Sequence, residues 1–153
     1  MTTQNHTLLA GVVAVAYQDA SPLTKTGVIV GLIVSHLIVD AIPHLHLYSF
    51  DDLLNSNKSS KLGALIELGG GLLVLPLIIG LVFNLNWLWL SCCVIAASFF
   101  DFLVAANIAP IKRLNIFAHW WAEKTSRKAQ IVFEIAQTIV LVIILMALIN
   151  INS

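Results

Sequence analysis

Long runs of apolar residues, separated by short polar segments, dominate this chain. Residues 62–83, 87–106 and 129–149 each have about the 20 apolar residues that a helix needs to cross a hydrocarbon core. Residues 26–42 form a run nearly as long, and residues 7–18 form a shorter one. The pattern therefore predicts an all-α fold, a polytopic transmembrane bundle of about five helices over residues 6–19, 24–42, 60–83, 86–107 and 128–150, with an interfacial segment at 111–123.

Composition supports this interpretation. Of the 153 residues, 59% are hydrophobic and 10% are charged, which is far from the balance of soluble proteins. The length suits one transmembrane domain over residues 1–153. The net charge of zero and the lack of a basic stripe exclude a nucleic-acid surface. Residues 1–7 contain no Lys or Arg, so we expect the first apolar run to be retained rather than cleaved as a signal peptide.

The distribution of basic residues predicts an orientation. If all five helices cross, the N-terminus, residues 43–61 and residues 107–128 share one side of the membrane. Lys25 then lies on the opposite side, and the other basic residues lie on the shared side: Lys58, Lys61, Lys112, Arg113, Lys124, Arg127 and Lys128. Because basic residues accumulate on the cytoplasmic side, the sequence predicts a multi-pass protein of the inner cell membrane with a cytoplasmic N-terminus.

Acidic residues inside the apolar runs are the strongest functional signal. Charges within a span are costly and tend to mark function. Asp40 and Asp101 lie near the ends of the second and fourth predicted helices, and Glu67 and Glu134 lie near the starts of the third and fifth. Consecutive spans alternate in direction, so all four carboxylates are expected to converge at one depth on the cytoplasmic side.

A similar arrangement of Lys and Glu recurs in two of the predicted helices. Glu67 follows Lys61 by six residues, and Glu134 follows Lys128 by six. At 1.5 Å per residue, each carboxylate lies about 9 Å beyond its lysine. Either a parallel internal repeat or chance similarity between apolar helices explains the match.

Histidines add nitrogen ligands to the predicted acidic cluster. His36 and Asp40 are four residues apart and share one face of the second helix. Pro43 is expected to end that helix just before His44. His6 opens the first helix on the same side of the membrane.

Imidazole and carboxylate groups together bind Zn, Mn or Fe, whereas four clustered carboxylates without a cation would repel one another. The sequence therefore predicts one or two divalent metal ions held by His36, Asp40, Glu67, Asp101 and Glu134, with His44 or His6 as a catalytic acid or base. Alternative roles remain open. His36 could simply hydrogen-bond to Asp40, and His44 could be solvated at the interface. His6 could be a metal ligand rather than an acid or base.

The stretch Ser35-His36-x-x-x-Asp40-x-x-Pro43-His44 resembles a signature of small prokaryotic membrane proteins, which are similar to a family of inner-membrane metal-dependent hydrolases. The resemblance covers residues 1–45. It implies metal ligation by His36, Asp40 and His44, and it matches His6 to an early histidine of the first helix. The second half departs from the pattern, because Ala105 rather than His follows Asp101 by four residues, and the family's His-Arg-Gly and Thr-His-Ser patterns are absent.

Three functions follow as hypotheses. The first is a membrane-embedded metal-dependent hydrolase acting on a phosphoester or lipid-like substrate near the cytoplasmic leaflet, with the metal activating water. The second is a metal-ion or proton-coupled transporter, which the apolar outer half disfavours within one protomer, although a homodimer would build a path. The third is a non-catalytic scaffold clamped by the metal. In each case the surrounding partner is the lipid bilayer.

Overall fold

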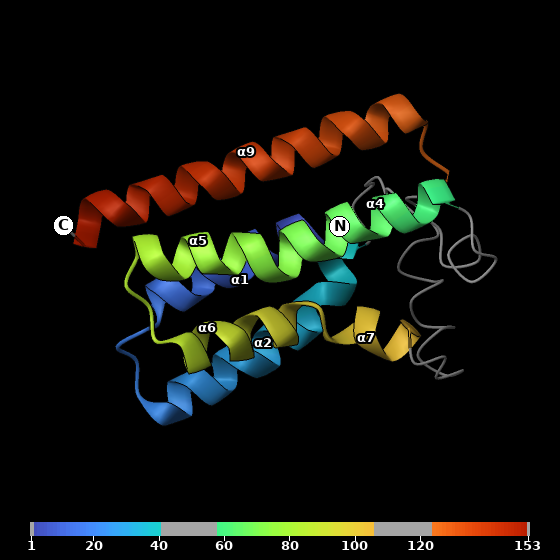
Figure 1. The fold of residues 1–153 in the computed structure, drawn as a ribbon. Coiled ribbons are helices and arrows are strands. Elements are labelled where there is room, and N and C mark those ends of the chain that lie inside the picture. Colours follow the sequence, from blue (N-terminus) through green and yellow to red (C-terminus); the bar gives the residue numbers. More distant parts are fainter. Residues whose placement is uncertain (1, 41–57, 106–123, 153) are drawn as a thin grey trace.

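The computed structural model describes residues 2–40, 58–105 and 124–152, and all the regular structure within these ranges is helical (Figure 1). The elements are α1 (Thr3–Ala16), α2 (Pro22–Asp40), α4 (Lys58–Gly69), the π-helix η1 (Gly70–Val74), α5 (Leu75–Val82), α6 (Trp87–Ala97), α7 (Phe99–Ala105) and α9 (Arg127–Asn152). The predicted all-α class is confirmed for these residues. The predicted interfacial segment at 111–123 lies outside them.

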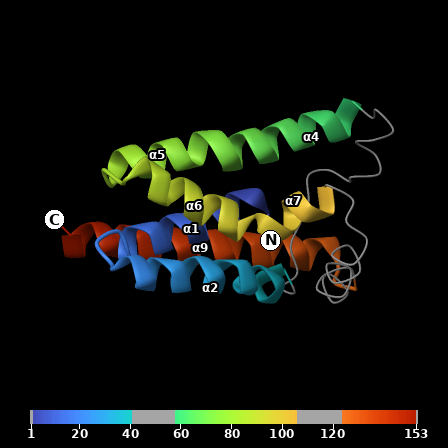
Figure 2. The same cartoon turned by 90° about the horizontal axis from the view of Figure 1, so that it is seen from below.

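The helices lie roughly along one common direction (Figures 1 and 2). α1, the continuous α4–η1–α5 rod and α9 run one way, whereas α2 and α6–α7 run the opposite way. The starts of α1, α4 and α9 therefore lie toward the same end of the bundle as the ends of α2 and α7. We call this the polar end, because the acidic and imidazole side chains described below gather there.

α1 is the helix around which the others pack. It contacts α2, α4, η1, α5, α6 and α9. Small residues let its neighbours approach closely: Ala10 and Ala14 are completely buried, and a Cβ at Gly11 would lie 2.7 Å from Ile79 Cδ1. The shortest of the predicted spans is thus the centre of the packing.

A tight turn returns the chain from α5 toward the polar end. Asn84 adopts the left-handed conformation (φ 48°), and Leu85 N donates to Gly80 O at 3.0 Å, as in a Schellman motif. Asn86 then caps α6, because its side chain accepts from Trp89 N at 3.1 Å. These local interactions start α6 beside α5 and in the opposite direction.

The π-helix η1 attaches the α4–η1–α5 rod to α1. Leu75 N donates to Gly70 O, five residues earlier. The next donor in this pattern would be Pro76, which has no N–H to offer Gly71 O. Instead, the Thr7 hydroxyl of α1 donates to Gly71 O at 2.7 Å. A side chain of α1 thus satisfies a carbonyl that the proline cannot.

The single helix predicted over residues 86–107 is wrong in one respect, because the chain breaks at Ser98 (φ −105°, ψ 13°) and divides it into α6 and α7. In an uninterrupted α-helix, Ala97 O would accept from the N–H of residue 101. Here Ala97 O interacts with the His36 ring of α2 at 2.7 Å. The break therefore exchanges a hydrogen bond within one helix for a contact between two helices.

Two helical stretches, Leu65–Val82 and Arg127–Leu148, are long and apolar enough to cross a membrane. Few of their side chains are buried by the rest of the chain, 22% in the first and 6% in the second. Large apolar side chains are consequently exposed along both stretches, among them Leu73, Leu81, Val132 and Ile143.

We predict that Gly71→Ala destabilises the packing of α1 on η1. The added Cβ would lie 2.8 Å from Thr3 Cγ2 and 3.0 Å from the Thr3 carbonyl carbon, so backbone would have to shift. The expected cost is about 1–3 kcal/mol. Thermal unfolding in detergent measures this as a lower Tm.

Gly69→Ala is the matched control, because nothing lies within 4 Å of its Cβ position and alanine favours a helix. The packing account predicts an unchanged or higher Tm for this variant. A Gly71→Ala protein as stable as Gly69→Ala would contradict the account.

Candidate metal centre

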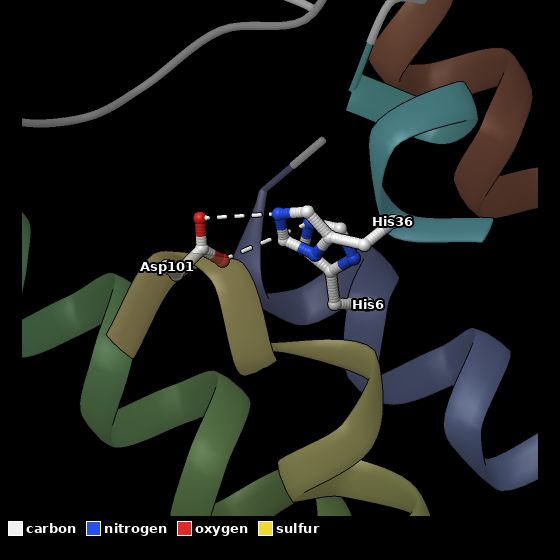
Figure 3. A group of neighbouring side chains, drawn as sticks. All are labelled: His6, His36 and Asp101. Carbon is white, nitrogen blue, oxygen red and sulfur yellow. Dashed lines mark ion pairs between the residues drawn. The ribbon is translucent and has the colours of Figure 1, made fainter. Parts of the chain in front are cut away.

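Three side chains from three helices meet at the polar end (Figure 3). His6 comes from the second turn of α1, His36 from the last turns of α2, and Asp101 from α7. One potential ligand atom from each lies within 4.8 Å of the others. We refer to these three residues as the His–His–Asp cluster.

The two imidazole rings are stacked and face the same carboxylate. Their centroids are 4.4 Å apart, and their planes differ by 8°. His6 Nε2 lies 3.8 Å from Asp101 Oδ2, and His36 Nε2 lies 3.6 Å from Asp101 Oδ1 (Figure 3). Both Nε2 atoms thus point to the same small volume beside Asp101.

The break at Ser98 orients the His36 ring. Ala97 O can only accept a hydrogen bond, so the 2.7 Å contact places a proton on His36 Nδ1. In the neutral ring, Nε2 then carries the lone pair and directs it toward Asp101. Histidine ligands of metal ions commonly donate their other ring nitrogen to a backbone carbonyl in this way, which fixes their orientation.

The separations within the cluster fit shared coordination better than direct hydrogen bonding. A hydrogen bond from ring nitrogen to carboxylate is expected at about 2.7–3.2 Å. Two ligand atoms bound tetrahedrally to one zinc ion, each about 2.1 Å from it, lie roughly 3.4 Å apart. The 3.6 and 3.8 Å distances run to different oxygens of Asp101 and both exceed the hydrogen-bond range. Because one ligand atom from each residue lies within 4.8 Å of the others, the cluster could hold a metal ion.

The cluster is closed on the imidazole side and open on the carboxylate side. The side chains of His6 and His36 are 1% and 0% exposed, whereas the Asp101 side chain is 34% exposed. Phe100 also packs on His36, with ring centroids 5.5 Å apart. A bound ion would therefore be held from within the bundle and remain reachable from outside beside Asp101.

Glu67 interacts with the first turn of α1. Its side chain is almost completely buried, and its Oε1 accepts from Thr3 N at 3.3 Å. Thr3 is the first residue of α1, so its N–H has no acceptor within the helix. A carboxylate at this position also complements the positive end of the helix dipole.

Glu134 binds the same turn through side chains. Its Oε1 accepts from the Thr2 hydroxyl and, at 2.7 Å, from Asn5 Nδ2. The Thr138 hydroxyl donates to Asn5 Oδ1 at 2.9 Å. Asn5 immediately precedes His6 and is completely buried, so this network holds the backbone that carries His6.

The structure brings together part of the predicted set of site residues. His36 and Asp101 come together as expected, and His6, predicted as an acid or base, joins them as a potential ligand. Glu67 and Glu134 lie against the first turn of α1, and ligation by either stays a prediction. Ligation by Asp40 and catalysis by His44 also stay predictions, because the Asp40 side chain and the whole of His44 lie outside the described residues.

Asn5 is the residue that sequence reasoning missed. The signal was the run of polar residues at positions 2–7, directly before an apolar run and around His6. In a helix at the centre of a bundle, such buried polar residues need hydrogen-bond partners from neighbouring helices. Asn5 is therefore best described as a positioning residue for His6.

The chain matches no protein-family model, no curated protein and no solved structure. The assignment of the site therefore depends on the geometry of the His–His–Asp cluster and of the contacts that orient it.

We predict that Glu134→Gln and Glu134→Ala differ in metal binding. Glutamine keeps an oxygen that can accept from Asn5 and Thr2, so the first turn of α1 stays in place. Alanine removes the acceptor, and zinc affinity should fall about 10- to 100-fold, as for other residues that orient metal ligands. Equilibrium zinc binding to the purified protein measures both variants.

A direct ligand role for Glu134 gives a different result, because an amide is a poor substitute for a coordinating carboxylate. Equal losses of affinity in the Gln and Ala variants would therefore support ligation and contradict the positioning role.

Proposed function

We propose that this protein is a membrane-embedded metal-dependent hydrolase whose catalytic ion is held by His6, His36 and Asp101. The observation that carries the proposal is that, among the described residues, three potential ligands converge and leave one side open. Catalytic zinc sites use three protein ligands, often two histidines and a carboxylate, and keep another position for water or substrate. The exposure of Asp101 leaves room for that position in the cluster.

A location within the membrane is supported by the outer surface of the bundle. Leu65–Val82 and Arg127–Leu148 have the length and composition of spans, and their apolar side chains face outward. Exposed apolar surface of this extent is unfavourable in water and favourable in lipid. Together with the basic residues near the polar end, it supports a multi-pass arrangement with the cluster at the cytoplasmic leaflet of the inner membrane.

In the proposed reaction, the metal ion and the protein side chains have different roles. When bound, a divalent metal lowers the pKa of a coordinated water and polarises the bond to be cleaved. Ala97 O orients the His36 ring before the ion binds, and the network around Asn5 holds the backbone that carries His6. Asp101 supplies negative charge on the side where substrate enters. His44 remains the candidate to move a proton.

The other two hypotheses are supported less well. A metal that only clamps helices usually has four protein ligands and no open position. Transport requires polar groups along the entire path, whereas α5 consists only of apolar residues and glycine. Within the part of the chain that the structure describes, the set of three potential ligands with an open side favours hydrolysis over both.

We predict that the purified protein binds one zinc, manganese or iron ion and hydrolyses ester substrates only when metal is present. His36→Ala and Asp101→Asn each remove a ligand, so metal content and hydrolysis should both fall, the latter roughly a hundredfold or more. Asp19→Asn is the control, because Asp19 is an exposed acid in the turn between α1 and α2. Element analysis and turnover of a chromogenic ester measure the two effects.

If both ligand variants bind metal as the wild type does, the ion is not held by the His–His–Asp cluster. If both ligand variants lose metal but the wild type shows no metal-dependent ester hydrolysis, the proposed hydrolase activity is contradicted and a structural role for the ion is supported.

A further inference from the structure

An apolar groove lies between α1 and α2, close to the His–His–Asp cluster. Its volume is about 340 Å³, and it opens to the outside of the bundle. The lining includes Leu9 and Val13 of α1, Tyr17 directly after this helix, and Gly31, Leu32 and Ser35 of α2. These residues follow helical spacing on each helix, so the groove runs along the two helices rather than across them.

At one end of the groove, the lining residues lie within one helical turn of the two histidines along α1 and α2. Ser35 immediately precedes His36, and Leu9 lies three residues beyond His6. From Leu9 to Tyr17 the helix rises roughly 12 Å at 1.5 Å per residue. The groove therefore leads from the metal ligands toward the middle of the proposed span, in the direction in which lipid chains lie.

We propose that this groove holds one acyl chain of a bilayer glycerophospholipid, and that its carboxylic ester lies at the His–His–Asp cluster. The inference rests on the proposed function and names its substrate class. Water adds its hydroxyl to the acyl carbon, the acyl C–O bond breaks, and the remaining proton goes to the alcohol oxygen. The products are a fatty acid and a lysolipid.

Two features favour a phospholipid chain over other occupants. The lining is almost entirely apolar, which suits hydrocarbon. At the same end of the bundle as the cluster, exposed basic residues lie at and just before the start of α9 and complement an anionic headgroup: Lys124, Arg127 and Lys128. An acyl chain in the groove with a phosphate near the polar end satisfies both features.

Two glycines of α2 provide a matched pair for testing the groove. Nothing lies within 4 Å of a Cβ placed at Gly27 or at Gly31, so a larger side chain at either position meets no steric obstacle there. Gly31 lines the groove, whereas Gly27, one turn earlier, is not part of the lining. Gly31→Leu should fill the groove, and Gly27→Leu should add the same side chain to the same helix without filling it.

The first experiment measures chain-length preference in lipid nanodiscs with bound zinc. For wild type, kcat/KM is expected to be higher for p-nitrophenyl decanoate than for p-nitrophenyl acetate. Gly31→Leu should lower kcat/KM for the decanoate about tenfold, the scale on which a blocked apolar subsite discriminates. The ratio of kcat/KM for the decanoate to that for the acetate should therefore fall in Gly31→Leu and stay at the wild-type value in Gly27→Leu. Both variants should keep the zinc content of wild type. Equal chain-length preference in the two glycine variants would show that the groove does not bind the acyl chain of the substrate.

A second experiment tests the groove without turnover. A phosphatidylglycerol with a diazirine on one acyl chain should label the groove segments of α1 and α2 on irradiation, and Gly31→Leu, but not Gly27→Leu, should reduce that label. If wild type hydrolyses neither ester but shows this labelling pattern, the proposed function fails and the acyl-chain site stands. Equal labelling in both variants would show that the acyl chain does not bind in the groove. A dimer that is dissociated by Gly31→Leu but not by Gly27→Leu would show that a second copy of the chain occupies the groove instead.

Discussion

The buried first turn of α1 is the constraint on which the rest of the site depends. Thr2, Thr3 and Asn5 carry polar groups into a bundle made mostly of apolar side chains, and each such group buried without a partner would cost about 1–3 kcal/mol. Glu67 and Glu134 supply the acceptors. The turn therefore has one favourable position, and that position sets His6 against His36.

The interruption at Ser98 completes the arrangement from the other side. Releasing Ala97 O allows it to orient His36, and beginning a new helix brings Asp101 to face both imidazoles. Neither contact is compatible with the regular helix that the apolar run alone would form. The first turn of α1, held by two glutamates, and the broken helix thus bring three potential ligands together.

Much of this could be predicted from the sequence, because length and hydropathy determine where helices lie along the chain. Alternating directions placed His6, His36 and Asp101 at one end, and the structure brings them together. Hydropathy predicts how far along a helix a residue lies but not the direction in which its side chain points. It therefore could not distinguish Asp101, which faces the imidazoles, from Glu67 and Glu134, which contact the first turn of α1. Ser98 is flanked by neither glycine nor proline, so no local signal marked the break.

X-ray absorption spectroscopy at the zinc edge tests the central claim most directly, because it reports the ligands of a bound ion without reference to turnover. The account predicts scattering from two imidazole rings and a carboxylate oxygen in the zinc-loaded protein, with one imidazole lost in His6→Ala. Coordination by oxygen alone, or an unchanged spectrum in that variant, would show that the ion lies elsewhere and would contradict the assigned centre.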